Sequence, residues 1–213
     1  MDDNKKKIAF IINPISGTQG KEHILKWLDE KLDKNRYMPE VIYTEWAGHA
    51  VEIAARKAKE EVFAVVAIGG DGTINEIARS LVHTKTALGI IPCGSGNGLA
   101  RHLQIPMEAK KAIDIINEGL IDIIDYGKIN DVPFFCTCGV GFDAFVSLQF
   151  SKAGRRGPLI YLEKTLLESL KYKPETYELE MDGSTSRYKA FLIACGNASQ
   201  YGNNAYILSL IHI

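Results

Sequence analysis

One stretch of the sequence decides the fold: Val62-Phe63-Ala64-Val65-Val66-Ala67-Ile68-Gly69-Gly70-Asp71-Gly72-Thr73-Ile74-Asn75-Glu76. Its first seven residues are apolar and rich in β-branched side chains, which is typical of a strand buried in the middle of a sheet. The glycines that follow break the strand, and the spacing of apolar residues becomes helical from Thr73 to Val82. The stretch therefore predicts a buried strand, a tight glycine-rich turn and a helix.

The glycine-rich turn has the chemistry of an anion site. Its glycines let the backbone fold tightly and offer N–H groups to anionic oxygens. Asp71 would repel a phosphate, so we expect it to hold Mg²⁺, directly or through water, or to orient a hydroxyl nucleophile. Thr73 stands where an N-cap or a phosphate-binding hydroxyl would, and Asn75 and Glu76 fall in the first helical turn. A plain turn with a capping threonine also fits, but the position after a buried strand favours nucleotide binding.

The flanking sequence repeats the alternation of strand and helix. Further strands are expected at Lys7–Ile12, Glu40–Thr44 and Ala87–Ile91. Further helices are expected at Ile24–Leu32, Ala50–Ala58, Leu99–Leu103 and Pro106–Glu118, the last with Gly119 as its C-cap. This order predicts an α/β fold in three layers, a parallel sheet with helices on both faces. Ligands bind such sheets where the carboxyl ends of strands meet helix N-termini.

From about residue 120 the pattern changes to hairpin-rich β structure. Strands are expected at Leu120–Lys128, Pro133–Cys138, Tyr177–Met181 and Tyr188–Cys195, and a helix at Leu159–Leu170. We therefore predict two domains: an α/β domain at 1–120 and a partial, mostly antiparallel β domain at 121–213.

Two more glycine-rich loops follow predicted strands. The first is Asn13–Gly20, with Ser16 and Gly17, and the other is Pro92–Arg101, with Gly94, Ser95, Gly96 and Asn97. Neither is a Walker A loop or the dinucleotide fingerprint. A strand-to-helix connection with a capping hydroxyl would explain the first loop taken alone. Together with the turn at Asp71, the loops predict a site for a phosphate-bearing ligand.

Composition narrows the class of protein. The chain has 213 residues, 46% hydrophobic and 24% charged, with a formal net charge of -1. This is ordinary globular usage, so we expect neither intrinsic disorder nor nucleic-acid binding through bulk charge. We also expect no transmembrane segment and no signal peptide, and therefore a cytoplasmic protein. Cys136 and Cys138 could form half of a metal site, but no second Cys or His pair has zinc spacing, so we interpret them as small buried hydrophobes.

At the loops the sequence resembles the diacylglycerol kinase catalytic domain family, which includes bacterial lipid kinases, sphingosine kinases and ceramide kinases. The matching elements are Asn13-Pro14-x-Ser16-Gly17, Thr44 with Gly48-His49-Ala50, Gly69-Gly70-Asp71-Gly72-Thr73-x-Asn75-Glu76, and Gly94-Ser95-Gly96-Asn97 before Leu99-Ala100-Arg101. The similarity runs from about Lys7 to about Ile207, and Gly139–Ala144 also looks like a family element. Four ordered motifs at matching spacing make the resemblance specific.

The resemblance implies a lipid kinase that transfers the γ-phosphoryl group of ATP, with Mg²⁺, to the hydroxyl of diacylglycerol or a sphingoid-type lipid at a membrane surface. The implied ATP-site residues are Asn13, Ser16, Gly17, Thr44, Gly70, Asp71, Gly72, Thr73, Asn75, Glu76, Gly94, Ser95, Gly96 and Asn97. Asp71 would be the catalytic and metal-binding residue. Asp143 would orient the lipid head group or merely cap a turn, and Lys152, Arg155 and Arg156 would meet an anionic membrane or lie in a solvated loop. A homodimer is compatible with the resemblance.

Two departures from the family pattern leave alternatives open. The family's catalytic aspartate lies beyond Tyr206 and has no counterpart here, and Leu208–Ile213 does not resemble the family's continuation. We therefore expect a C-terminally truncated sequence, which would make a nucleotide-binding protein without turnover one alternative. Gly98 stands where many bacterial diacylglycerol kinases carry aspartate, which leans toward the sphingoid-base version. A soluble-substrate kinase such as an NAD kinase shares the Gly-Gly-Asp-Gly element and is the other alternative.

Overall fold

A computed structural model describes residues 5–16, 21–142, 144–145, 172–202 and 205–206. The chain divides into two compact units, which we describe separately. Unit 1 comprises residues 1–136 and 197–213, and unit 2 comprises residues 137–196. The predicted domain boundary at residue 120 stays a prediction. The two compact units are defined by contacts between residues, and unit 1 includes residues 197–213, so they do not test a boundary along the sequence.

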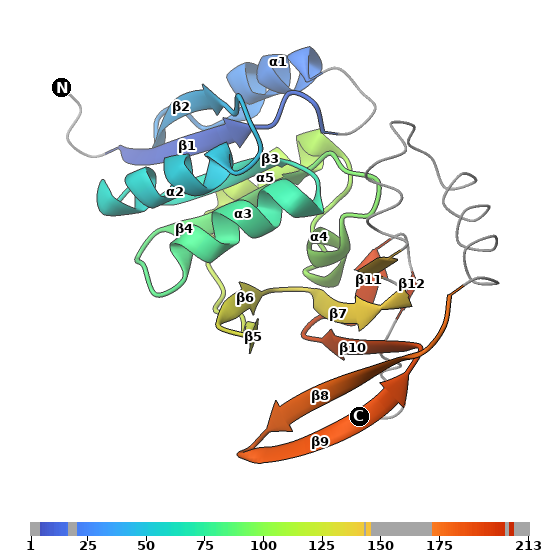
Figure 1. Ribbon diagram of the computed structural model, residues 1–213. Coiled ribbons are helices and arrows are strands. Elements are labelled where there is room, and N and C mark those ends of the chain that lie inside the picture. Colours follow the sequence, from blue (N-terminus) through green and yellow to red (C-terminus); the bar gives the residue numbers. More distant parts are fainter. Residues whose placement is uncertain (1–4, 17–20, 143, 146–171, 203–204, 207–213) are drawn as a thin grey trace. The chain divides into compact units, whose positions relative to one another are not determined.

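Unit 1 is built on a parallel sheet, as the sequence predicts (Figure 1). Its four strands lie in the order β2-β1-β3-β4. Their bounds are β1 Lys6–Ile12, β2 Tyr37–Tyr43, β3 Ala64–Gly69 and β4 Ala87–Pro92. Every residue of β3 is buried, which explains why this strand reads as an unbroken apolar run.

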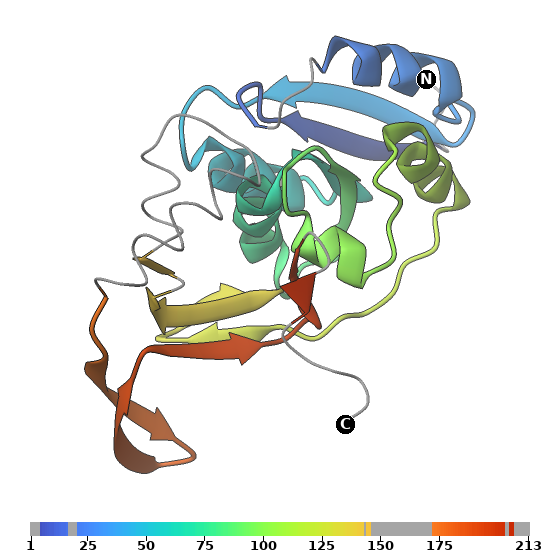
Figure 2. The same cartoon turned by 90° about the vertical axis from the view of Figure 1, so that its right-hand side faces the viewer.

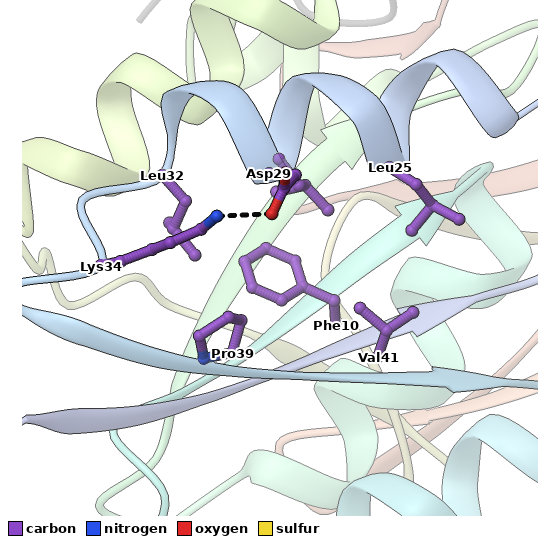
Figure 3. A pocket seen from close by; sticks show the side chains of 8 residues that line it. Phe10, Leu25, Asp29, Leu32, Lys34, Pro39 and Val41 are labelled. Carbon is purple, nitrogen blue, oxygen red and sulfur yellow. Dashed lines mark hydrogen bonds and ion pairs between the residues drawn. The ribbon is translucent and has the colours of Figure 1, made fainter.

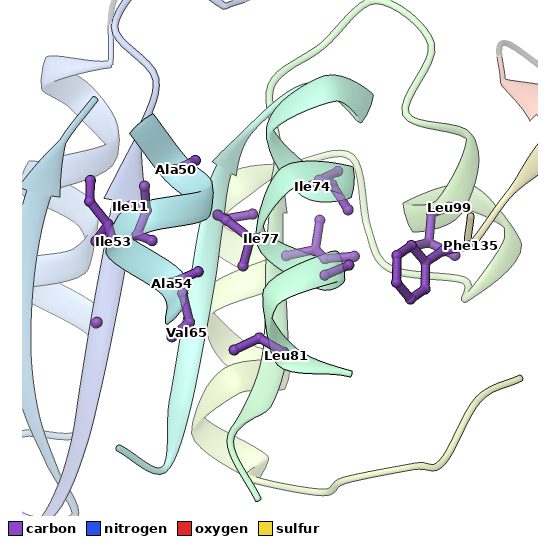
Figure 4. Close-up of a cluster of buried hydrophobic side chains, with 14 of the residues drawn as sticks. Ile11, Ala50, Ile53, Ala54, Val65, Ile74, Ile77, Leu81, Leu99 and Phe135 are labelled. Carbon is purple, nitrogen blue, oxygen red and sulfur yellow. The ribbon is translucent and has the colours of Figure 1, made fainter. Parts of the chain in front are cut away.

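Helices cover both faces of this sheet (Figures 1 and 2). Their bounds are α1 Glu22–Lys31, α2 His49–Lys59, α3 Asp71–Leu81, α4 Gly98–His102 and α5 Ala109–Glu118. Neighbouring residues of β1 point to opposite faces. Ile11 packs with Ile53 of α2 and Ile77 of α3 (Figure 4), and Phe10 packs on the other side with α1 and α5. The predicted three-layer α/β arrangement is therefore confirmed.

An apolar pocket of about 230 Å³ lies between α1 and the strands β1 and β2 (Figure 3). Phe10 forms its floor, and Leu25 of α1 and Leu32, the C-cap residue of this helix, lie above it. Leu28 of α1 also lines the pocket. Asp29 and Lys34 are ion-paired at its edge. None of the residues that line this pocket belongs to the predicted nucleotide site.

The starts of α3 and α5 differ from the prediction in a way that changes their N-cap residues. α3 begins at Asp71, two residues before Thr73, so Gly70 is the N-cap residue. α5 begins at Ala109 rather than near Pro106, because Glu108 takes an extended conformation (φ -84°, ψ 118°) and becomes the N-cap. Gly119 ends α5 in the left-handed region (φ 68°), which confirms it as the C-cap.

The predicted strand Leu120–Lys128 is wrong over most of its length. Regular pairing begins only at β5, Gly127–Ile129, which forms a hairpin with β6, Val132–Phe134. Residues 120–126 have no ladder partner within the described ranges, and a strand without a partner is not stable alone. Ile123 in this segment is 99% exposed. Unit 1 also contains two short paired strands, β11 Gln200–Gly202 and β12 Ala205–Tyr206.

Unit 2 is antiparallel, as predicted. Its strands are β7 Thr137–Gly141, β8 Glu175–Met181, β9 Ser184–Ala190 and β10 Leu192–Gly196. β7 pairs with β10, and β8 forms a hairpin with β9 through Asp182 and Gly183, both at positive φ. Pro133–Cys138 is two strands, β6 and β7, rather than one. The predicted helix at 159–170 lies outside the described residues.

None of the helices in the described ranges combines the length and apolar character that crossing a membrane requires.

One buried cation ties α2 to the edge strand of the sheet. The Lys57 side chain is only 7% exposed and lies 2.8 Å from Glu40 of β2 and 2.7 Å from Glu60. Burial lowers the pKa of Lys57, but the hydrogen bonds and charges of the two glutamates outweigh it, so its pKa is raised above 10.5. A raised pKa means that this stabilisation is complete at neutral pH and is lost as the pH rises through the folded-state value.

We predict that Lys57→Met lowers the free energy of unfolding by about 1–3 kcal/mol at pH 7, because it removes a buried ammonium that pairs with two carboxylates. The measurement is urea unfolding of both proteins. Lys26→Met is the matched control, since Lys26 is exposed and its ion pair with Glu30 spans 3.7 Å. An equal effect of both substitutions would show that burial of Lys57 contributes nothing.

Candidate functional site

The carboxyl ends of the strands bring the predicted loops together. Ile12 pairs with Ile68, and Gly69 pairs with Pro92, so β1, β3 and β4 end side by side. Backbone hydrogen bonds extend the pairing into the loops: the N–H of Asn13 donates to the carbonyl of Ile68 and the N–H of Cys93 donates to the carbonyl of Gly69. Residues far apart in the sequence therefore meet at one edge of the sheet.

Asp71 connects the second loop to the third. One oxygen of its carboxylate accepts the N–H of Asn97 at 2.8 Å, and the other accepts the N–H of Gly98 at 2.7 Å. These donors stand at the N-terminus of α4, where backbone N–H groups lack partners within the helix. Asp71 is thus first of all the residue that positions the third loop.

Asn97 builds the third loop from inside. Its backbone is left-handed (φ 54°), a conformation that asparagine tolerates better than most residues. Its side chain accepts the N–H of Gly94 and donates to the carbonyl of the same residue, both at 2.8 Å. Asn97 is also buried, whereas Ser95 is exposed at the tip of the loop. Of these two predicted site residues, Ser95 is the one accessible to a ligand.

Close backbone contacts explain two glycines of the third loop. A Cβ added to Gly94 would stand 2.6 Å from the Cα of Gly70, so the two loops touch through their backbones. A Cβ added to Gly96 would stand 2.9 Å from the Asp71 carboxylate. These glycines are required for the loops to approach each other.

Gly98 is required by a segment that the sequence did not connect with the site. A Cβ there would stand 2.8 Å from the carbonyl oxygen of Tyr201 and 2.9 Å from the sulfur of Cys136. β11 also forms a bridge from Gly202 to Asn97. The glycines of Gly196-Asn197 and Tyr201-Gly202 indicate turns, but nothing in the sequence predicts that this segment contacts α4.

The first loop is held to α3 and is contacted by a cation that sequence reasoning missed. The amide of Asn13 donates to the hydroxyl of Thr73 at 3.2 Å, so Thr73, the third residue of α3, is a buried partner of the first loop rather than an N-cap. The ammonium of Lys21 donates to the Asn13 carbonyl and, at 2.7 Å, to the hydroxyl of Ser16. The signal was available in the sequence, because Lys21 directly follows Gly20 at the start of a helix.

The loop after β2 borders the same edge. The N–H of Thr44 donates to the Ile12 carbonyl at 2.9 Å, which places this buried residue beside the end of β1. The N–H of Gly48 donates to the carboxylate of Glu76 at 3.3 Å and ties the loop to α3. Asn75 precedes Glu76 on the helix and is half-buried. Thr44, Asn75 and Glu76 therefore lie at or near the loops that the sequence assigned to the site.

The N-terminus of α3 has the properties of an anion site. Among the residues that the structure describes, no side chain caps this helix, and its aspartate bonds to the third loop instead. A Cβ added to Gly72, in the first turn, would meet no described atom within 4 Å outside its immediate chain neighbours and the backbone of its own helix. The packing therefore does not require glycine here, and open space lies beside N–H groups that favour an anion.

The electrostatic surroundings of the site include two cysteine thiols. Burial raises the pKa of Cys136 to about 11, and the negative charge of Asp71 adds to the effect. Burial also raises the pKa of Cys93, against the opposing charge of Lys21. Both thiols therefore stay protonated at neutral pH, and a charged thiolate is not a ligand here.

The metal prediction rests on Asp71 alone. Within the described part of the chain, no group of three or more His, Cys, Asp or Glu side chains is arranged to hold a metal ion. Mg²⁺ bound with a nucleotide commonly uses one or two carboxylates together with phosphates and water. Asp71 is exposed and each of its oxygens receives one N–H, so it can serve as a single carboxylate of that kind.

Several predicted residues fall outside the described residues. They are Gly17, Asp143, Lys152, Arg155 and Arg156.

Sequence comparisons identify the two parts of the chain. The family model described as diacylglycerol kinase catalytic domain matches residues 7–129, and the one described as YegS C-terminal NAD kinase beta sandwich-like domain matches residues 136–209. A diacylglycerol kinase of Staphylococcus saprophyticus is 30% identical over 196 residues, which cover 90% of this chain and 64% of that protein. A diacylglycerol kinase of Staphylococcus aureus is 31% identical over 199 residues, 90% of this chain and 62% of that protein.

The chain thus spans less than two thirds of the length of these curated relatives. A crystal structure of a diacylglycerol kinase from Bacillus anthracis strain Sterne has the same fold, with a TM-score of 0.70 at 21% identity, covering 97% of this chain and 68% of that chain. Because the catalytic-domain match includes more than half of the chain and its glycine-rich loops, the chain belongs to the diacylglycerol kinase catalytic domain family.

Proposed function

We propose that this protein is an ATP-dependent lipid kinase that phosphorylates a lipid hydroxyl, with diacylglycerol as the first candidate substrate. One observation supports nucleotide binding above the others. The first turn of α3 offers backbone N–H groups beside the open space at Gly72, at the edge where three loops meet. Phosphate groups bind at such helix N-termini through these donors and the helix dipole.

The residues of unit 1 would divide the work at this site. The N–H groups of Asp71, Gly72 and Thr73 would bind phosphate oxygens, and Ser95 would reach the ligand from the third loop. Asn13 and Asn97 would act indirectly, since their side chains already hold Thr73 and Gly94 in place. Gly70, Gly94 and Gly96 would keep the loops close enough to surround the triphosphate. Thr44 and Glu76 would border the nucleotide from the side of β2.

Asp71 would have two roles, positioning the third loop and contributing one carboxylate to Mg²⁺. The ion, when bound, would neutralise charge on the phosphates during transfer. In the reaction, a bond forms between the lipid hydroxyl oxygen and the γ-phosphorus while the bond to the bridging β–γ oxygen breaks. ADP departs with the electron pair of the broken bond, and the hydroxyl proton passes to solvent water. Positioning and charge neutralisation supply most of the catalysis in such transfers.

Two observations put diacylglycerol ahead of a sphingoid-type lipid in this proposal. Gly98 was the sequence feature that favoured sphingoid-base kinases. The close contacts of Tyr201 and Cys136 explain why glycine is needed at this position, without reference to the substrate. The curated relatives are named diacylglycerol kinases. We further propose that the protein is cytoplasmic and meets its lipid at a membrane surface.

We predict that Gly72→Ala weakens ATP binding at least tenfold and leaves the fold intact. The added methyl group meets no described atom, and alanine in a helix is favoured over glycine by about 0.5–1 kcal/mol. The substitution should therefore preserve or raise the melting temperature while it occupies the space proposed for phosphate. Isothermal titration with ATP measures the first effect and thermal unfolding the second. Unchanged ATP affinity would remove α3 from the site.

We predict that Asp71→Asn loosens the third loop and abolishes phosphoryl transfer. An amide can accept only one of the two N–H groups that the carboxylate accepts, and an unsatisfied donor costs about 1–3 kcal/mol. Hydrogen exchange at Asn97 and Gly98 should accelerate. Asp114→Asn is the matched control, because Asp114 is exposed and pairs with Lys31. Normal exchange and normal turnover in Asp71→Asn would contradict both of its proposed roles.

We predict that labelled phosphate from ATP appears in diacylglycerol presented in mixed micelles. Sphingosine and NAD are tested in parallel, the latter because residues 136–209 match a domain described as NAD kinase-like. Phosphorylation of NAD alone would contradict the lipid kinase. ATP binding without transfer to any acceptor would instead support a nucleotide-binding protein without turnover.

A further inference from the structure

An exposed aromatic pair stands on the loop between β2 and α2. The indole of Trp46 lies flat on the imidazole of His49, with ring centroids 3.8 Å apart and planes inclined by 6°. Trp46 is 53% exposed, so one face of the indole is covered by His49 while much of the ring remains in solvent. Exposed apolar side chains that stand singly are common on protein surfaces, so the ordered stacking on His49, rather than exposure alone, distinguishes this indole.

Hydrogen bonds hold this pair in place. The backbone N–H of Glu45 donates to Nδ1 of His49 at 3.1 Å, and the N–H of His49 donates to the carbonyl of Trp46 at 3.3 Å. Gly48 turns the chain between the two rings in the left-handed region (φ 88°). The imidazole is thereby fixed under the indole, so a flat surface is available before any ligand arrives.

The loop that bears the pair is tied to the proposed nucleotide site at both ends. Thr44, two residues before Trp46, bonds to the end of β1, and Gly48 bonds to Glu76 of α3. Glu76 follows Gly72 by four residues, which is about 6 Å along a helix axis. The loop that carries the aromatic pair therefore borders the same sheet edge as the phosphate-binding turn.

We propose that Trp46, supported by His49, is the platform on which the base of the nucleotide stacks. This inference rests on the proposed function and adds the residue that would recognise the base. Every base has a flat π face, and stacking on an aromatic side chain contributes to binding without requiring hydrogen bonds to the base. A neutral base also tolerates the negative charges of Glu45 and Glu76, which would repel an anionic membrane surface from the same loop.

The chain is suited to a fluorescence test because it contains only two tryptophans, Trp27 and Trp46. Trp27 lies on α1 and packs with the hydrophobic cluster on the sheet face opposite α2. In Trp27→Phe the remaining indole is Trp46, and ATP should quench its emission, whereas tripolyphosphate, which lacks a base, should not. Trp46→Phe retains only Trp27 and is the matched control, with no quenching expected.

Binding of ATP to Trp46→Ala gives the decisive measurement. The dissociation constant for ATP should rise about 5- to 150-fold, the change expected from losing one base–aromatic stack. The dissociation constant for tripolyphosphate should stay unchanged, and Trp46→Phe should keep most of the ATP affinity. The platform is wrong if Trp46→Ala binds ATP as the wild type does.

Two other results would also contradict the proposed base platform, and each would identify the reason. If Trp46→Ala loses affinity for vesicles of phosphatidylglycerol and phosphatidylcholine but binds ATP normally, Trp46 meets the membrane instead. If the wild type binds neither ATP nor tripolyphosphate, the proposed function fails as well. Failure of the platform alone is distinct from this last result, because ATP binding by the wild type then remains intact.

Discussion

The carboxylate of Asp71 accepts two backbone N–H groups from the start of α4, and the geometry of the candidate site depends on this interaction. It connects the helix that follows β3 with the helix that follows β4. A carboxylate makes stronger hydrogen bonds to N–H groups than a neutral acceptor does. Because the side chain is used in this way, it does not cap its own helix, and the first turn of α3 keeps its donors. One interaction thus shapes the third loop and leaves a candidate anion site beside it.

Backbone contact between the loops is the second constraint. Gly70 and Gly94 approach so closely that neither could carry a side chain without movement. Gly98 is constrained in the same manner by Tyr201. Gly72 differs, since no described packing explains it. The glycines of these two loops therefore have separate causes, and Gly72 is the one among them with open space beside it. Matching the sequence motif alone does not distinguish a glycine required by packing from one beside open space.

The sequence predicted the sheet of unit 1 because burial on both faces leaves long apolar runs such as Ala64–Gly69. It failed at residues 120–126, where the apolar pattern of Ile121, Ile123 and Ile124 suggested a strand. Strand formation also needs a ladder partner, and the sequence alone does not show whether one is present.

The candidate site was predictable only in part for a related reason. The composition of the loops identified Asn13, Asp71 and Ser95 as polar groups at strand ends. It could not show that Asp71 bonds to α4 or that Lys21 folds back onto Ser16. These contacts depend on how residues distant in the sequence meet, whereas periodicity reports only local structure. The stacking of Trp46 on His49 has the same origin, because it requires the left-handed turn at Gly48.

The negative charge of an aspartate repels an anionic ligand nearby, but the helix termini change this balance. Asp71 is the first residue of α3, and its carboxylate contacts the N-terminus of α4. A negative charge is stabilised at a helix N-terminus. In the free protein the carboxylate therefore occupies a favourable position. Phosphates arriving at the same turn would repel it unless a cation lay between them. Under the proposed function, Asp71 thus makes nucleotide binding dependent on a divalent cation, since the same charge that orders the empty site disfavours a bare triphosphate.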